Sequence, residues 1–315
     1  MPSPSQAADS GARPLAPAQV GRPPAWLRRA RPLLGTIVEI GVDARRGEQR
    51  GGEQRGGEHR HRDAQLHAAI DAAFAGIERV HALMSLHAPD SELSRVNRDA
   101  ARQAQSVDPH TYAVFEAALH MAAVSGGAFD PCIAPRLEAW GLLPRTDAPA
   151  DPAGNWRDIE LLPGKRIRYA KPLRVDLGGI AKGYAVDVAV RSLQLSGIEN
   201  IAVNAGGDLR VVGPHSQIVK LRHPSAPLHS AHAVTLCDAA LATSAGYFSR
   251  RAGTIGEVSA LVNPHDGRPY LGGHSISVRA ADCMTADALT KVVMFAAPAV
   301  AETALAEYAA EAYVI

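Results

Sequence analysis

The sequence is poor in cysteine, in aromatic residues and in net charge. Its three cysteines, Cys132, Cys237 and Cys283, form no CxxC pair, so we expect neither a disulfide framework nor a cysteine-bound zinc ion. A formal net charge of +1 gives no electrostatic reason to expect a nucleic acid or an anionic membrane as a partner. The aromatic content is 5% and many apolar positions are alanine, which fits closely packed helices and equally a biased genome composition.

Long apolar runs are missing as well. No segment approaches the roughly 20 apolar residues that a membrane-spanning helix needs. Residues 1–30 are rich in Pro and Ala, contain no continuous apolar stretch typical of an export signal, and carry no cysteine for a lipid anchor. We interpret them as a disordered tail and expect a cytoplasmic protein without a membrane span.

What is present is the composition of an ordinary soluble domain. The chain has 315 residues, of which 46% are apolar and 21% are charged, enough for a sizeable core. No Pro/Ser-rich linker interrupts residues 31–315, so we expect one domain there. Within it, residues 43–62 repeat Arg, Gly, Glu and Gln at short intervals. Such a composition is too polar to bury, and we predict a solvated loop.

The apolar pattern indicates helices interspersed with strands. Apolar residues between positions 66 and 84 recur at helical spacing, and Asp108 followed by Pro109 is typical of a helix start. No regular βαβ repeat is visible, so we predict an α+β fold with a mainly antiparallel sheet. Further helices are expected over 180–195 and 284–295 and up to about 307, and strands over 33–42, 166–170, 201–205, 208–213, 217–222, 232–237, 275–280 and 312–315.

The densest motif begins with VDLGGIAKGYAVD at residue 175. Gly178 and Gly179 allow a tight turn just before a predicted helix, and a helix N-terminus favours an anion such as phosphate. Lys182 stands in the first turn, where a cation opposes the helix dipole unless it faces an anion. The alternative is a strand–turn–helix unit in which the glycines serve packing and Lys182 is solvated.

This segment resembles the signature of the FAD:protein FMN transferases, the ApbE-like flavin transferases. Other segments are similar to motifs of that family, in the same order along the chain. They are LLGT at 33–36, MSLHAPDSELSRVN at 84–97, GGAFDPCIAPRLEAWGL at 126–142, ATSAGYF and MTADALTK.

The resemblance implies an ApbE-like α+β fold and transfer of FMN from FAD to a Thr or Ser hydroxyl of a target protein, with release of AMP. It also implies Mg²⁺, because a metal ion that bridges the diphosphate neutralises charge on the attacked and leaving oxygens. The implied partners are FAD and the acceptor protein. By position, the flavin-nucleotide contacts are Leu34, Ala128, Phe129, Asp130, Asp176 and Lys182, and the metal ligands are the Gly179 carbonyl, Asp287 and Thr290.

Two of these residues have equally open alternatives. Phe129 also fits simple core packing. Asp130, which precedes Pro131, also fits a turn residue.

Two departures from the family pattern bear directly on the site. Lys291 stands where the family has a metal-site Thr, on the same helix face as Asp287; this is either an ordinary helix pair or a change that weakens Mg²⁺ binding. The family's candidate base, a His, is missing from the aligned stretch SALVNPHDGRP. His265 nearby fits a surface turn better, so no catalytic base is assigned. The preferred interpretation is an FMN transferase, and the alternative is a transfer-deficient homologue that binds or slowly hydrolyses FAD.

Overall fold

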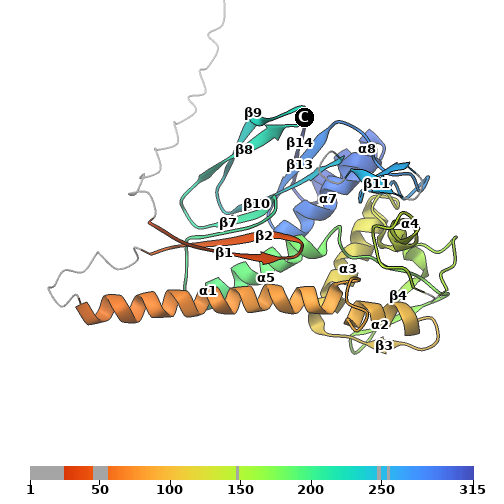
Figure 1. Ribbon diagram of the computed structural model, residues 1–315, viewed down its shortest axis with the longest axis horizontal. Coiled ribbons are helices and arrows are strands. Elements are labelled where there is room, and N and C mark those ends of the chain that lie inside the picture. Colours follow the sequence, from red (N-terminus) through yellow and green to blue (C-terminus); the bar gives the residue numbers. More distant parts are fainter. Residues whose placement is uncertain (1–24, 45–55, 147–148, 247–249, 254–255) are drawn as a thin grey trace, which may run out of the picture.

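A seven-stranded sheet forms the centre of the molecule (Figure 1). The computed structural model describes residues 25–44, 56–146, 149–246, 250–253 and 256–315. All neighbouring strands of this sheet pair antiparallel, which confirms the predicted α+β class. In spatial order the strands are β1 (Trp26–Leu33), β2 (Thr36–Asp43), β6 (Ile201–Ala205), β7 (Asp208–Val212), β10 (Ala239–Ala245), β13 (Ser275–Ala280) and β14 (Glu311–Val314).

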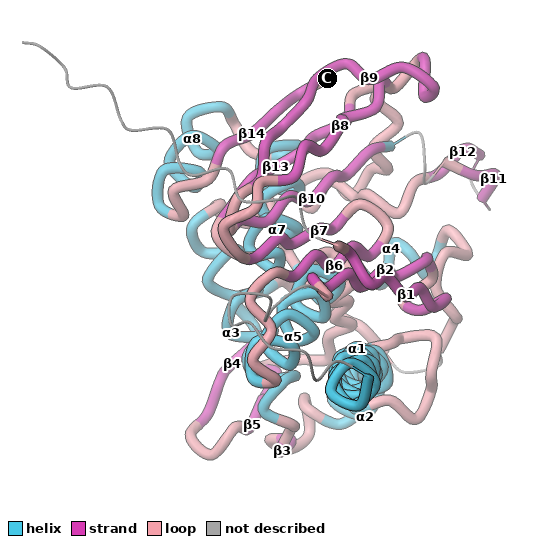
Figure 2. Tube along the Cα trace, turned by 90° about the vertical axis from the view of Figure 1, so that its left-hand side faces the viewer, coloured by secondary structure: helices cyan, strands magenta, loops and turns pink. Residues whose placement is uncertain are grey.

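Helices cover one face of this sheet (Figure 2). Helix α5 (Ala181–Leu195) packs on β6 and β7, and α7 (Cys283–Phe295) packs on β10 and β13. The long helix α1 (Gly56–Met84) lies against α5. The helices predicted within these ranges are therefore confirmed.

The opposite face of the sheet is covered by the hairpin of β8 (Gln217–His223) and β9 (Ala226–Leu236) (Figure 2). Strand β10 shows how one strand serves both faces, since successive side chains of a strand point in opposite directions. Ala240 and Ala242 belong to the helix-side core, whereas Leu241 packs in the smaller core beneath the hairpin.

Shorter elements complete the fold. They include a three-stranded sheet in the order β3-β5-β4. Helix α3 begins after Asp108, whose side chain accepts a hydrogen bond from the His110 N–H, and has Pro109 in its first turn, as predicted. The elements are α2 (Glu92–Asp99), β3 (Gln105–Ser106), α3 (Pro109–Val124), η1 (Pro131–Ile133), α4 (Ala134–Ala139), η2 (Trp156–Asp158), β4 (Ile159–Leu162), β5 (Arg166–Tyr169), β11 (Arg251–Gly253), β12 (Gly256–Val258) and α8 (Pro298–Glu307).

The boundary of the predicted tail is wrong by several residues. Residues 26–30 were expected in the tail, yet they form most of β1, which pairs along its whole length with β2. The predicted single strand over 33–42 is instead the turn and second arm of this hairpin. Its turn is Leu34–Gly35, and both residues have positive φ, 55° and 71°, as a two-residue hairpin turn requires. Residues 1–24 of the expected tail lie outside the described part of the chain.

The predicted loop over 43–62 is also shorter than expected. Asp43 still belongs to β2, and α1 already begins at Gly56. Residues 45–55 are not described. The backbone over 56–62 is helical in spite of its polar composition, because it continues a helix whose later turns are buried at Ile70, Phe74 and Ile77.

Among the described residues, none of the helices is long and apolar enough to cross a membrane. The cytoplasmic location inferred from the sequence stays a prediction.

Candidate functional site

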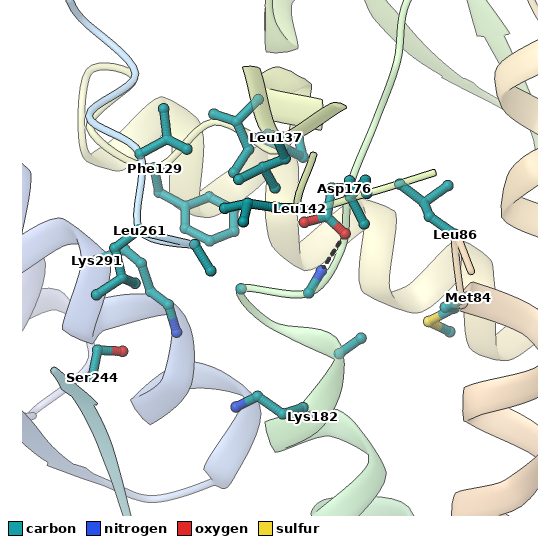
Figure 3. A pocket seen from close by; sticks show the side chains of 18 of the residues that line it. Met84, Leu86, Phe129, Leu137, Leu142, Asp176, Lys182, Ser244, Leu261 and Lys291 are labelled. Atoms are coloured by element: carbon teal, nitrogen blue, oxygen red, sulfur yellow. Dashed lines mark hydrogen bonds between the residues drawn. The ribbon is translucent and has the colours of Figure 1, made fainter. Parts of the chain in front are cut away.

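A pocket of about 510 Å³ opens where the start of α5 meets the loop after α3, α7 and the segment around Leu261 (Figure 3). One part of its wall is apolar and the other carries charged side chains. Seven of the sequence-predicted site residues line it, namely Leu34, Ala128, Phe129, Asp130, Asp176, Gly179 and Lys182. Segments far apart in the sequence therefore meet at one site.

The loop after α3 presents Ala128 and Phe129 to the pocket. Helix α3 ends at Val124 with Ser125 as its C-cap residue. Gly126 and Gly127 follow with φ of 61° and 91°, a conformation that glycine adopts without strain. The Ser125 hydroxyl then accepts a hydrogen bond from the Phe129 N–H at 3.1 Å. This turn fixes Phe129 at 6% exposure, with its ring in the pocket wall (Figure 3).

Asp130 is at once a turn residue and a pocket residue. Its carboxylate accepts hydrogen bonds from the Cys132 N–H at 2.8 Å and the Trp156 N–H at 3.3 Å. Burial raises the pKa of Asp130, and these two hydrogen bonds oppose that shift. Asp130 is therefore a turn residue, as one of its two interpretations predicted. It also lines the pocket, and its contact with a nucleotide stays a prediction.

Asp176 lies between the same loop and the start of α5. Its backbone N–H donates to the Pro131 carbonyl at 2.7 Å, and its Oδ1 accepts the Gly178 N–H at 3.0 Å (Figure 3). Burial raises the pKa of this carboxyl as well. Asp176 thereby shapes the turn that leads into the helix.

Helix α5 starts at the pocket wall, after the turn at Gly178 and Gly179. Its N-cap residue, Ile180, makes no side-chain cap, so the first N–H groups of the helix lack a partner from that side chain. A side chain at Gly179 would touch Phe129 at 3.4 Å and the Lys291 side chain at 3.6 Å. The glycine therefore leaves the space between these two side chains open.

Two lysines and two buried aspartates form the charged part of the site. Lys182 Nζ donates to Asp208 Oδ2 and lies 3.8 Å from Asp287 Oδ2. Lys291 Nζ donates to Asp287 Oδ1 and, at 2.9 Å, to the Asp287 carbonyl. The Asp208 and Asp287 side chains are 2% and 1% exposed, whereas both lysines line the pocket.

The electrostatic environment keeps Lys182 charged. Burial by itself lowers the pKa of Lys182, but the carboxylates of Asp208 and Asp287 outweigh it and raise that pKa. Burial and the nearby Asp287 raise the pKa of Asp208, and Lys182 opposes them. Lys182 is therefore paired with a buried carboxylate, while its own side chain is 37% exposed at the pocket.

The predicted metal ligands are arranged differently from a cation site. Asp287 and Thr290 are buried under the pocket at 1% and 0% exposure. Asp287 Oδ2 accepts the Gly183 N–H at 3.2 Å and Oδ1 accepts Lys291. The Thr290 hydroxyl donates to the Asp287 carbonyl at 2.7 Å and is bonded to the Ser244 hydroxyl at 2.7 Å.

This set does not fit a divalent cation, because an ammonium group already occupies the carboxylate and the hydroxyl is used within the protein. The part of the chain that the structure describes holds no cluster of three or more His, Cys, Asp or Glu residues suited to a metal ion.

Other pocket residues were not predicted as site residues, although several of them stand in the motifs quoted from the sequence. The residue type of a Leu or His does not by itself separate a pocket residue from a core or surface residue. His265 is exposed in a turn, where its N–H donates to Asn263 Oδ1 at 3.0 Å, and it is not a pocket residue. The additional lining residues include His81, Met84, Leu86, His87, Leu137, Leu142, Leu261 and Phe295.

Comparison with known proteins agrees with this arrangement. The model of the ApbE family matches residues 34–314. A FAD:protein FMN transferase of Vibrio cholerae is 34% identical over 235 residues, covering 69% of this chain and 70% of that protein. One of Rhodobacter capsulatus is 31% identical over 236 residues, covering 69% of this chain and 44% of its own length.

Solved structures show the same fold. The flavin transferase ApbE from Vibrio cholerae superimposes with a TM-score of 0.70 at 26% identity, covering 93% of this chain and 94% of that one. An ApbE protein from Thermotoga maritima gives a TM-score of 0.74 at 24% identity, covering 92% and 94%. With a family match that runs through nearly every element of the fold and a pocket built from the family's motifs, the chain belongs to the ApbE family.

Proposed function

We propose that this protein is a FAD:protein FMN transferase, which moves FMN from FAD to a Thr or Ser hydroxyl of an acceptor protein and releases AMP. The observation that carries the proposal is the pocket in which Phe129, Asp176 and Lys182 meet at the start of α5. Its apolar wall suits a flat aromatic ring, and its ammonium groups suit a diphosphate. Two relatives, at 34% and 31% identity, are named FAD:protein FMN transferases.

Different residues of the pocket bind different parts of FAD. Phe129, Leu137 and Leu142 form an apolar surface for the isoalloxazine ring. Asp130 and Asp176 offer carboxyl oxygens to N–H or O–H groups of the nucleotide. The first turn of α5, with Lys182, faces negative charge on the phosphates.

The chemistry is a phosphoryl-group transfer. The acceptor hydroxyl oxygen bonds to the phosphorus on the FMN side, and its proton passes to the solvent. The bond from that phosphorus to the bridging oxygen breaks, and the bridging oxygen leaves with AMP. Fixed positive charge at the pocket stabilises the charge that develops on the phosphate oxygens during this exchange.

The test combines the purified full-length chain with FAD and a candidate acceptor protein, with and without MgCl₂. The control is the same acceptor with its target threonine replaced by alanine. We expect the unmutated acceptor, but not its alanine variant, to gain the mass of one FMN group, with one AMP released per modification. Formation of free FMN and AMP with an unmodified acceptor would assign the chain to FAD hydrolysis instead.

A further inference from the structure

Two ammonium groups converge on one buried carboxylate at the charged end of the pocket. Lys182 extends from α5 and Lys291 from α7 (Figure 3). Both form an ion pair with Asp287. Asp287 is 1% exposed, whereas the side chains of Lys182 and Lys291 are 37% and 14% exposed. The aspartate is therefore buried below the lysines, and the lysines are the groups that a ligand in the pocket meets.

Each ammonium group has hydrogen-bonding capacity left for a ligand. A lysine carries three N–H donors and no acceptor. Lys291 uses two of them, on the carboxylate and on the carbonyl of Asp287. Lys182 uses one on Asp208. The remaining donors belong to groups that line the pocket, and their anchors hold them in place before any ligand arrives.

The same contacts oppose a divalent cation at this position. Mg²⁺ needs oxygen ligands at about 2.0–2.1 Å in near-octahedral geometry. Here Asp287 Oδ1 accepts Lys291, Oδ2 accepts the Gly183 N–H, and the Thr290 hydroxyl is already bonded to the Asp287 carbonyl and to Ser244. A cation bound to Asp287 would also lie within a few ångströms of two ammonium groups, which repel it.

We infer that Lys291, together with Lys182, supplies the positive charge that this pocket offers to the diphosphate of its dinucleotide, in place of a divalent cation. Binding of FAD is then independent of Mg²⁺. The inference rests on the proposed function, because it concerns how the same pocket holds FAD. Asp208 and Asp287 are positioning residues, which orient the two ammonium groups and need not touch the ligand.

The first measurement is the affinity of the wild-type protein for FAD, by flavin fluorescence, in EDTA and in excess MgCl₂. We expect dissociation constants that agree within about twofold, because the charge is fixed in the protein. A tightening of about tenfold or more by Mg²⁺ would overturn the inference while leaving the proposed function intact. Absence of FAD binding in both buffers would overturn the proposed function, and the inference with it.

The second measurement uses Lys291→Gln, which keeps a hydrogen-bond donor beside Asp287 but removes the charge. We expect FAD affinity in EDTA to fall about tenfold or more, the usual effect of losing a charge-assisted bond. Lys291→Thr should show the same loss in EDTA and regain part of it in MgCl₂, because it frees one oxygen of Asp287. Unchanged affinity in folded Lys291→Gln would overturn the inference.

The matched control is Lys220→Thr. Lys220 is exposed on β8 and does not line the pocket, so its FAD affinity should equal that of the wild type in both buffers. Circular dichroism and the thermal unfolding midpoint establish that each variant is folded. If Lys291→Thr fails to fold, the Gln variant and the wild-type comparison still decide the matter.

Discussion

For Phe129, the sequence left two interpretations open, namely core packing and contact with the flavin. It is only 6% exposed and belongs to the main core, and it also lines the pocket. Phe129 therefore packs in the core and also lines the pocket, and its contact with a flavin stays a prediction. The sequence predicted that Lys291 shares a helix face with Asp287. It did not predict that both oxygens of this buried carboxylate accept hydrogen bonds within the protein.

Replacing Phe129 by Leu separates the two roles. The change conserves most of the volume, so the free energy of unfolding should fall by less than about 1.5 kcal/mol. Loss of the aromatic face should weaken FAD binding by about 0.5–1.5 kcal/mol, the usual worth of an aromatic pair beyond its area. Isothermal titration calorimetry measures the affinity, and urea unfolding measures the stability.

The control for this substitution is Phe115→Leu. Phe115 is fully buried in α3 and is not a pocket residue, so its replacement should cost stability without changing FAD affinity. Equal FAD affinity in the wild type and in Phe129→Leu would leave Phe129 as a core residue alone.

At the scale of elements, the contact between α5 and α7 decides where the two lysines meet. Gly183 makes this contact possible, because a Cβ there would lie 2.2 Å from the Cys283 carbonyl oxygen. Asp187 on α5 also accepts the N–H groups of Cys283 and Met284 at 3.0 and 2.9 Å, which ties the first turn of α7 to α5. The periodicity of the sequence predicted both helices, but nothing in it predicted how closely they pack.

Gly183→Ala should therefore act on both the fold and the site. Alanine favours a helix by about 1 kcal/mol over glycine. The steric overlap with α7 should outweigh this gain and lower the free energy of unfolding by a net amount of about 1–2 kcal/mol. FAD affinity should fall as well, since a shift of α7 carries Lys291 with it. Gly273→Ala is the control, because a Cβ at Gly273 meets no atom within 4 Å. A Gly183→Ala variant as stable as the wild type would contradict the close packing.

The cap of α3 gives a prediction with a defined pH dependence. Burial alone would raise the pKa of Asp108, but the hydrogen bond from the His110 N–H and the Arg79 guanidinium together lower it. A carboxyl with a lowered pKa contributes stability above its unfolded-state pKa and loses it as the pH falls through the folded-state value.

Asp108→Ala should accordingly cost about 0.5–2 kcal/mol at neutral pH, and this cost should shrink as the pH falls below the ordinary pKa of an aspartate. Urea unfolding of both proteins at neutral and at acidic pH measures the difference. Asp108→Asn, which keeps the cap without a titrating group, should show a smaller change with pH. A cost for Asp108→Ala that stays constant across this range would refute a charged cap.

At the scale of the whole molecule, composition and periodicity predicted the class of fold, and the ordered motifs predicted which segments meet. The order of strands was not predictable, because antiparallel pairing between β2 and β6 joins residues more than 150 positions apart in the chain. Residues 26–30 of β1 were expected in the tail because the segment 1–30 is rich in Pro and Ala. Arg28 pairs with Glu39 on β2, and Arg29 and Arg31 pair with Asp71 on α1, and these partners are known only once the chain has folded.

The two faces of the central sheet should contribute separately to stability and to binding. Leu236 is fully buried beneath the β8–β9 hairpin and contributes nothing to the pocket wall. Leu236→Ala should lower the free energy of unfolding by about 2–5 kcal/mol, as for other large-to-small core changes. Because FAD binds only the folded chain, saturating FAD adds stability that depends on its affinity, about 2.7 kcal/mol at 100 times the dissociation constant.

Differential scanning fluorimetry in EDTA, with and without FAD, compares these contributions directly. Leu236→Ala should unfold at a lower temperature than the wild type but keep a similar increase on adding FAD, since its pocket is intact. Lys291→Gln should unfold below the wild-type temperature without ligand, because the buried Asp287 carboxylate loses a charged partner, and should also show a smaller increase with FAD. If Leu236→Ala instead lost the FAD-dependent increase, the hairpin face would support the pocket through the sheet. A FAD-dependent increase that survives in Leu236→Ala but shrinks in Lys291→Gln would separate the two roles. Burial under the hairpin would then stabilise the sheet, and the lysine on the helix face would act on the ligand.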